Sequence, residues 1–235
     1  AGNKLTGLSQ KARDHWAYKP VVKPVVPEVK NKVWVHNPID SFVLAKLESV
    51  GLQPNPTTNP ESLLRRIHYD LVGLPPVADK VRAFSGQYTA AVLVDAASIQ
   101  RGQPGKAVDT LIAKEVDELL ASPHYGERWG RHWLDTARYS DTRGLAVDQG
   151  NSLFEDYRYA YAWTYRNYVI DAINTDKPYD QFIVEQLAAD RLPDLKKEDP
   201  RLAALGFITV GKRFDNIDDT IDERIDTTTK AFLGL

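Results

Sequence analysis

The chain has 235 residues, of which 43% are apolar and 26% charged, a composition typical of one large or two small globular domains. Its 30 basic and 32 acidic side chains give a net charge of −2, which argues against nucleic acid as the main partner, because duplex binding needs a concentrated basic face. The sequence has no cysteine, which excludes disulfides, cysteine zinc sites and covalent haem attachment within these residues, and no apolar run approaches the roughly 20 residues of a membrane span.

The first segment, residues 1–36, is predicted to be an extended strap or linker. Pro20, Pro24 and Pro27 alternate with pairs of valines, and the fixed φ of proline favours extended or polyproline backbone. The valines either dock on the surface of the domain or form a binding site for a partner, and the pattern is compatible with both. Because residue 1 is alanine and the last four residues form an apolar tail, we expect both ends to be cuts in a longer protein.

A helical domain is predicted from residue 37 to residue 235, truncated at its C-terminus. Asn37 is a suitable N-cap for its first helix, the proline after it suits a first turn, and Gly51 ends the helix. The apolar face of this helix consists of Ile39, Phe42, Val43, Leu47 and Val50.

A second helix is predicted to open with the capping box Thr58-x-x-Glu61 and to end at Gly73. A short third helix is predicted over residues 77–84. Residues 87–106 are rich in alanine and then contain an Arg-Gly-Gln-Pro-Gly run, so we interpret them as an inserted excursion.

The rest of the chain is also predicted to be helical. Apolar residues recur at helical spacing, with helix breakers between the runs, in six segments: about 108–120, 125–139, 155–174, 179–190, 200–207 and 220–233. Only residues 33–35 and 207–210 resemble strands. The predicted fold class is therefore all-α, an irregular multi-helix bundle with a proline-rich N-terminal strap.

Two of these helices have unusual surfaces. The helix over residues 155–174 is surrounded by aromatic side chains, which indicates core packing or, as the alternative, the wall of a pocket. These are Tyr157, Tyr159, Tyr161, Trp163, Tyr165 and Tyr168. Residues 215–226 carry six acids, with isoleucine at 217, 221 and 225, and are predicted to form an amphipathic helix with an acidic outer face.

The densest group of polar and aromatic residues lies in residues 122–141. Treated as a helix, this segment places Trp129, Trp133 and Ala137 on one side. The opposite side carries a polar ladder: Arg128, His132, Asp135 and Tyr139. We interpret the ladder as a hydrogen-bonded strut between helices, with contact to a ligand or to the edge of a haem as the first alternative and catalysis as the second.

Catalysis at this segment would use His132, Asp135 and Asp141 as acid–base or metal groups. However, no two histidines stand at metal-ligand spacing, and the common nucleophile and phosphate-binding motifs are missing from the sequence. No metal site is predicted, and an enzyme is not indicated.

Several blocks, in order along nearly the whole chain, resemble one family. They include HWAYKPVVKPVVPEVKNKVWVHNPIDSFVLAKLESVGL, RRIHYDLVGLPP, SPHYGERWGRHWLDTARYSD, YAWTYRNYVIDAIN, KPYDQFIVEQLAAD and TIDERIDTTTKAFLGL. The family is the planctomycete cytochrome c-associated domain of unknown function, found in large secreted bacterial proteins. Its members continue past the FLGL block into a C-x-x-C-H haem-attachment motif, whereas this chain stops before it.

The resemblance implies a secreted or periplasmic helical domain near haem, with no established reaction. The predicted function is a non-catalytic part of a cytochrome c-associated protein that packs beside a c-type haem segment outside this chain. Its partners would be that segment and the neighbouring domains of the same protein, and the haem-edge residues would be Arg128, His132, Asp135 and Tyr139. The alternatives are a secreted hydrolase acting on polysaccharide or its substituents through His132, Asp135 and Asp141, and an adhesion or assembly module that uses the strap.

Overall fold

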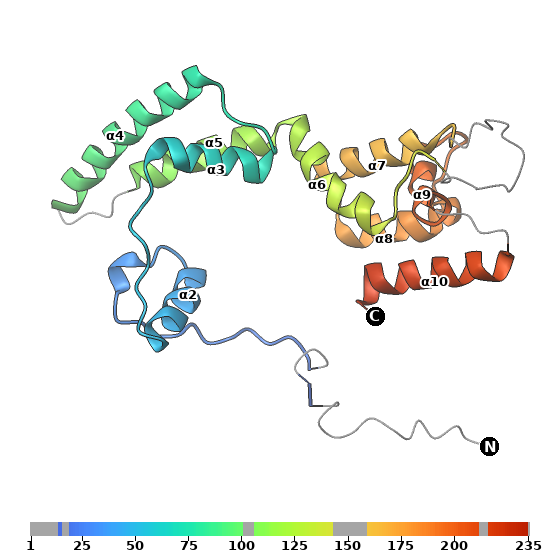
Figure 1. Ribbon diagram of the computed structural model, residues 1–235, viewed down its shortest axis with the longest axis horizontal. Helices are drawn as coiled ribbons and strands as arrows, with labels where there is room; N and C mark the ends of the chain where they lie inside the picture. The colour runs from blue at the N-terminus through green and yellow to red at the C-terminus, as the bar shows by residue number, and fades with distance from the viewer. Residues whose placement is uncertain (1–13, 16–18, 101–105, 143–158, 212–215, 235) are drawn as a thin grey trace, which may run out of the picture. The chain divides into compact units, whose positions relative to one another are not determined.

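The computed structural model consists of helices joined by loops (Figure 1). It describes residues 14–15, 19–100, 106–142, 159–211 and 216–234. These ranges contain no strand, so the all-α prediction is confirmed. The segments that most resembled strands coincide with the 3-10 helix η2 (Lys32–Trp34) and the short helix α9 (Gly206–Thr209).

The chain divides into two compact units, residues 1–57 and 58–235, which are described separately. In the first unit, helix α2 (Pro38–Ser49) begins where the sequence predicts. The Oδ1 atom of Asn37 accepts the backbone N–H of Ile39 at 2.8 Å, while the Asp40 carboxylate accepts the N–H of Asn37 at 3.0 Å. This reciprocal capping box satisfies donors that the first turn of a helix leaves free, and it confirms the predicted N-cap.

The end of the strap is fixed to α2 by a side chain of that helix. The Glu48 carboxylate accepts hydrogen bonds of 3.1 Å from the backbone N–H groups of Lys30 and Asn31, next to the buried Val29. The valines nearer the N-terminus, Val21 among them, are exposed. The predicted boundary between strap and domain at residue 36 stays a prediction.

The second unit opens with three helices: α3 (Pro60–Leu71), α4 (Ala78–Gln100) and α5 (Ala107–Leu120). The N-cap of α3 is Asn59, whose Oδ1 accepts the N–H of Ser62 at 2.8 Å, so the prediction of Thr58 is wrong by one residue. Pro60 occupies the first helical position, and the extended residue before it therefore becomes the cap.

Helix α4 differs most from its predicted bounds. The predicted end of the helix at residue 84 is wrong, because α4 is a single helix of 23 residues that continues to Gln100. The alanines of this segment are strong helix formers, so the helix continues through it. Residues 101–105 of the predicted loop lie outside the described residues, and the interpretation of residues 87–106 as an insertion stays a prediction.

A buried group of charged side chains joins these three helices. Glu115 of α5 accepts hydrogen bonds from the Nε2 atom of His68 in α3, at 3.1 Å, and from the Nζ atom of Lys80 in α4, at 2.6 Å. Lys80 also pairs with Glu118 at 3.1 Å. Glu115 and His68 are buried, so this paired group holds the three helices together from the inside.

The larger hydrophobic core lies in the remaining helices. They are α6 (Pro123–Thr136), α7 (Ala162–Asn174), α8 (Tyr179–Ala188), η3 (Ala189–Arg191), η4 (Pro200–Leu205), α9 and α10 (Ile217–Leu233). Aromatic rings fill much of this core, where the indole of Trp133 lies 4.9 Å from the ring of Phe182 and 5.8 Å from that of Phe207. The described helices include none that is both long and apolar enough to span a lipid bilayer.

Helices α6 and α7 approach closely because α6 has glycine at the contact. A Cβ atom on Gly126 would lie 2.5 Å from the carbonyl oxygen of Ile170, inside van der Waals contact. The Gly126 N–H also donates to Oδ1 of Asn174 at 2.7 Å. This contact fixes the side of α6 that faces α7 and leaves the other side exposed.

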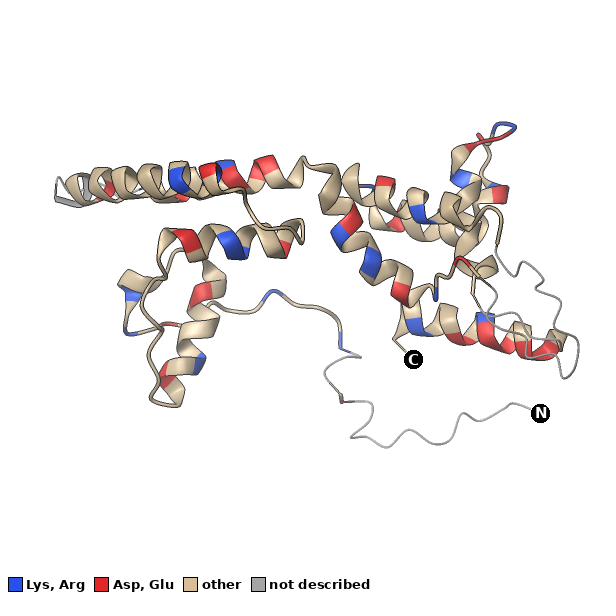
Figure 2. Cartoon of the chain, turned by 45° about the horizontal axis from the view of Figure 1, so that its top comes forward, with Lys and Arg blue, Asp and Glu red and all other residues tan. Residues whose placement is uncertain are grey.

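Helix α10 is amphipathic, but its orientation corrects the prediction of a purely acidic outer face. Ile217, Ile221 and Ile225 are all exposed together with most of the acidic residues, which stand out along the helix in Figure 2. The buried side consists of Thr220, Thr227 and the partly buried Phe232, whose ring lies 5.2 Å from that of Phe207. Thr220 and Thr227 are separated by almost two helical turns, so they share one face with Glu223, whose carboxylate pairs with Arg138 and holds that face inward.

Candidate functional site

The predicted polar ladder is interrupted where α6 ends. The helix stops at Thr136, and Arg138 has a φ of 55°, so the chain turns before Tyr139. The Tyr139 hydroxyl donates to Oδ1 of Asp141 at 2.5 Å, and burial, followed by this carboxylate, raises the pKa of Tyr139 to about 12. Tyr139 therefore does not continue the row of residues on α6.

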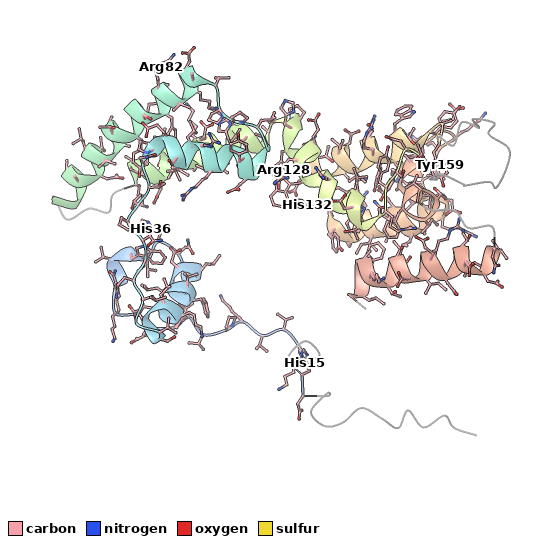
Figure 3. All side chains as sticks on the ribbon, in the orientation of Figure 1. His15, His36, Arg82, Arg128, His132 and Tyr159 are labelled. Carbon is pink, nitrogen blue, oxygen red and sulfur yellow. The ribbon has the colours of Figure 1, made fainter. Side chains whose placement is uncertain are left out.

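The other three ladder residues lie on the exposed side of α6, and Figure 3 labels two of them, Arg128 and His132. Asp135 pairs with Arg131, whose Nε atom lies 3.9 Å from Oδ2 of Asp135. Among the described residues no hydrogen bond joins His132 to Asp135. The interpretation as a buried strut is therefore wrong.

Trp129 also differs from its prediction, since its side chain is 41% exposed although the spacing placed it with the core residue Trp133. Its ring lies 5.5 Å from the ring of His132 and 6.3 Å from that of Tyr125. The side chain of Arg128, which precedes Trp129, lies against Gly73. A Cβ atom built on Gly73 would be only 2.8 Å from the Cδ atom of Arg128. We call the exposed residues Arg128, Trp129, Arg131 and His132 the α6 face.

The three catalytic candidates lie on the exposed side of α6 or just after its end. His132 and Asp135 are exposed on α6, and Asp141 follows the end of that helix, bonded to Tyr139. In the part of the chain that the structure describes, no group of three or more histidine, aspartate or glutamate side chains could hold a metal ion. None of the three candidates lines either hollow described below.

A buried network that the sequence reasoning missed lies between α7 and α8. The fully buried Glu185 accepts a hydrogen bond from the Tyr168 hydroxyl at 2.7 Å and one from Gln181 at 3.0 Å, and it pairs with Lys177. Burial alone would raise the pKa of Glu185, but Lys177 and Tyr168 outweigh it, so the pKa lies below its ordinary value. The only sequence signal was a glutamate on the same helical face as Phe182.

A second buried pair extends this network toward the aromatic core. The Tyr165 hydroxyl donates to Oε1 of Gln186 at 2.9 Å and accepts the indole N–H of Trp133 at 3.1 Å. Burial raises the pKa of both Tyr165 and Tyr168, so both stay neutral hydrogen-bond donors at ordinary pH. These tyrosines are core residues, as the primary interpretation of their helix predicts.

The exposed side of α7 forms a hollow with η4, whose cavity volume is about 630 Å³. We call it the α7–η4 groove. Its α7 wall carries Trp163, Thr164, Asn167, Tyr168, Asp171, Ala172 and Thr175, and its other wall carries Lys177 and residues 199–203. The alternative interpretation of this helix as a pocket wall is confirmed for these aromatic residues, while Tyr157 lies outside the described residues.

The cation on the η4 side of the groove is held rigidly. The Arg201 guanidinium donates to both carboxylate oxygens of Asp199, at 3.0 and 2.8 Å, and to Asp194 at 3.1 Å. Arg201 holds the pKa of Asp199 well below its ordinary range. The guanidinium is thus charge-compensated before any ligand arrives.

A smaller hollow of about 350 Å³ lies along the N-terminal part of α7. It shares Thr164, Leu202 and Ala203 with the α7–η4 groove, so the two hollows adjoin. Tyr161, which is exposed, contributes to its lining, and so does Tyr159, whose hydroxyl donates to the carbonyl of Gly211 at 2.7 Å (Figure 3).

Three of the five histidines lie in helices of the second unit. His68 is bonded to Glu115, the Nδ1 atom of His124 lies 2.7 Å from Glu127, and His132 is exposed beside Trp129. Neither hollow along α7 is lined by a histidine, and the sequence has no cysteine. A c-type haem associated with this protein would have to be carried by another segment.

Comparison with known proteins gives one family and no individual relative. A family model named PSCyt2 and described as a protein of unknown function (DUF1549) matches residues 38–235. Neither a curated protein nor a solved structure matches the chain. Since the match covers most of the sequence, the chain belongs to the PSCyt2 (DUF1549) family of proteins of unknown function.

Proposed function

We propose that this chain is a helical, non-catalytic part of an exported planctomycete cytochrome c-associated protein, and that its α6 face docks a segment that carries c-type haem. The haem itself belongs to that segment, in the same protein or in a neighbouring domain. The resemblance of the sequence blocks and the name of the PSCyt2 family support the association with a cytochrome.

The observation that carries the proposal is the exposure of the α6 face. The opposite side of α6 packs against α7 through Gly126, while Trp129 stays 41% exposed between arginine and histidine side chains. Tryptophan and arginine are the residues most enriched at the energetic centres of protein interfaces. A helix that buries one side and presents this combination on the other is suited to binding a second surface.

The chemistry of the α6 face matches the exposed edge of a c-type haem. Such an edge is an apolar macrocycle that bears carboxylate groups, and it would contact the indole of Trp129 and the guanidinium of Arg128. Arg131 already has Asp135 as a counter-ion at 3.9 Å, so its charge is the less available of the two. His132 contributes a ring beside that of Trp129.

The test uses the complete open reading frame that encodes this chain. It would be expressed with export and c-type cytochrome maturation, and its visible spectrum and reduction potential would be measured. We expect c-type absorption bands, and we expect Trp129→Ala to shift the reduction potential, because removal of the indole lets water reach the haem edge.

Trp163→Ala is the matched control, since this indole is also about half exposed but lies on α7. It should leave the reduction potential of the complete protein unchanged. If the complete protein has no c-type bands and binds no c-type cytochrome from the same organism, the proposal is wrong. Equal shifts in the two variants would contradict the role of the α6 face in particular.

A further inference from the structure

The α7–η4 groove has a regular row of side chains on its α7 rim. Trp163, Asn167 and Asp171 follow one another at intervals of four residues, which places neighbours about 6 Å apart along one side of the helix. All three are exposed, and the Trp163 side chain is 49% accessible. The row therefore presents an aromatic ring, an amide and a carboxylate to whatever occupies the groove.

The polar members of this row have unused hydrogen-bonding capacity. Within the described ranges, the side chains of Asn167 and Asp171 make no hydrogen bond and no ion pair. The cations across the groove, in contrast, are already paired. Arg201 is bonded to Asp199 and Asp194, and Lys177 is bonded to Glu185. A ligand would thus find free amide and carboxylate groups but no uncompensated positive charge.

This combination disfavours an anionic ligand and favours a neutral one with many hydroxyl groups. A phosphate or carboxylate ligand would compete with Asp199 for Arg201 and with the buried Glu185 for Lys177, and it would face the carboxylate of Asp171. Hydroxyl groups, in contrast, both donate and accept, so they match a carboxylate and an amide equally well.

We propose that the α7–η4 groove binds a neutral pyranose oligosaccharide. The C–H face of one sugar ring lies on the indole of Trp163, because the negative face of an aromatic ring attracts the weakly positive hydrogens of the sugar. The hydroxyl groups of the next rings bond to Asn167 and Asp171. The spacing of the three side chains along the helix, about 6 Å, is comparable to the length of one sugar unit in a chain of linked pyranose rings.

The adjoining hollow extends this site beyond a single sugar. It continues along α7 past Thr164 to Tyr161, which offers a second exposed aromatic ring. A site that runs along a helix in this way suits a chain of sugars better than a monosaccharide. The inference concerns binding alone and is independent of the α6 face, which lies on another helix.

The experiment measures binding of cellohexaose, xylohexaose and mannohexaose to the 235-residue chain by calorimetry, with a galacturonate hexasaccharide as the acidic comparison. We expect at least one neutral hexasaccharide to bind, and to bind more tightly than its monosaccharide. In Trp163→Ala, affinity should fall by at least about tenfold, and in Asn167→Ala by a few-fold.

Trp129→Ala is the matched control, because it removes a comparably exposed indole outside the groove, and the affinity of this variant for the hexasaccharides should equal that of the wild type. Circular dichroism checks that each variant is folded, and Asn167→Ala provides the test if Trp163→Ala is not. Failure of all three neutral hexasaccharides at millimolar concentration overturns the proposal. So does preferred binding of the acidic one, or unchanged affinity in both groove variants.

Discussion

Glu185 illustrates how one buried charge can organise several helices. Its carboxylate is fully buried on α8, yet each oxygen has donors, from Tyr168 of α7, from Gln181 one turn earlier and from Lys177 before the helix. A buried carboxylate is tolerated only when it is paired and hydrogen-bonded in this way. We therefore expect the network to be sensitive to the loss of any single partner.

Tyr168→Phe removes one of these donors without changing the shape of the ring. We expect the free energy of unfolding to fall by about 2 kcal/mol, because a hydrogen bond to a buried charged group is lost. Urea denaturation followed by circular dichroism measures this. Tyr179→Phe is the control, since Tyr179 is exposed at the start of α8, and it should change the midpoint little. An equal loss of unfolding free energy in the two variants would show that the buried hydrogen bond contributes no more to stability than an exposed hydroxyl group.

The lowered pKa of Glu185 makes the stability of the folded state depend on pH, in a direction that follows from the sign of the shift. The folded state holds this proton less tightly than the unfolded state, so the stabilisation is complete above the ordinary pKa of glutamate. It is lost as the pH falls through the lowered pKa of the folded state. In Glu185→Gln this titration is missing.

The difference in unfolding free energy between the wild type and Glu185→Gln should therefore narrow between about pH 7 and about pH 3. Urea denaturation of both proteins at each pH measures it. A difference that stays constant over this range would contradict the assignment.

At the scale of elements, local signals predicted most of the helices and long-range contacts decided the rest. The N-cap Asn37 depends on neighbouring residues alone and is correctly predicted, whereas the ladder needed α6 to continue to Tyr139. The turn at Arg138 depends on partners far along the chain, since its guanidinium bonds to the carbonyl of Phe207 at 3.2 Å and pairs with Glu223. A pattern of helical spacing cannot contain that information.

The same limit applies to the candidate sites. The aromatic residues around its helix mark Trp163 as unusual, but the wall that completes the groove comes from η4, about forty residues later in the chain. The α4 error was local, by contrast. Residues 87–100 contain alanines of high helix propensity, which extend α4 up to the Gly- and Pro-containing run that follows.

The close contact of α6 and α7 gives a prediction for the glycines. Gly126→Ala places a methyl group 2.5 Å from the carbonyl of Ile170, so we expect it to cost about 2 kcal/mol of stability through overpacking. Gly86→Ala, on α4, meets no atom within 4 Å and should stabilise the helix by up to about 1 kcal/mol. Thermal denaturation of both variants measures the difference, and destabilisation by both would refute the packing argument.

At the scale of the whole molecule, the two compact units differ greatly in what they bury. The first unit has only Val29, Ser41 and Leu44 buried among its described residues, whereas the aromatic core, the Glu185 network and both hollows lie in residues 58–235. A unit of under 60 residues with so small a core cannot offset the conformational entropy of its chain. Stability should therefore reside in the second unit.

This difference predicts how fragments behave. Residues 58–235 expressed alone should keep the main thermal transition of the full chain within a few degrees, because they retain the core.

Residues 1–57 alone should show little helix by circular dichroism, since the Asn37 cap and the Glu48 bonds to the strap stabilise only twelve helical residues. A fragment of residues 37–235 removes the strap but keeps α2 together with its N-cap, Asn37. It should keep the main transition and lose helix signal from α2, because the contacts of Glu48 with Lys30 and Asn31 are gone. Loss of the main transition in the fragment of residues 58–235 would show instead that the first unit is an integral part of the core.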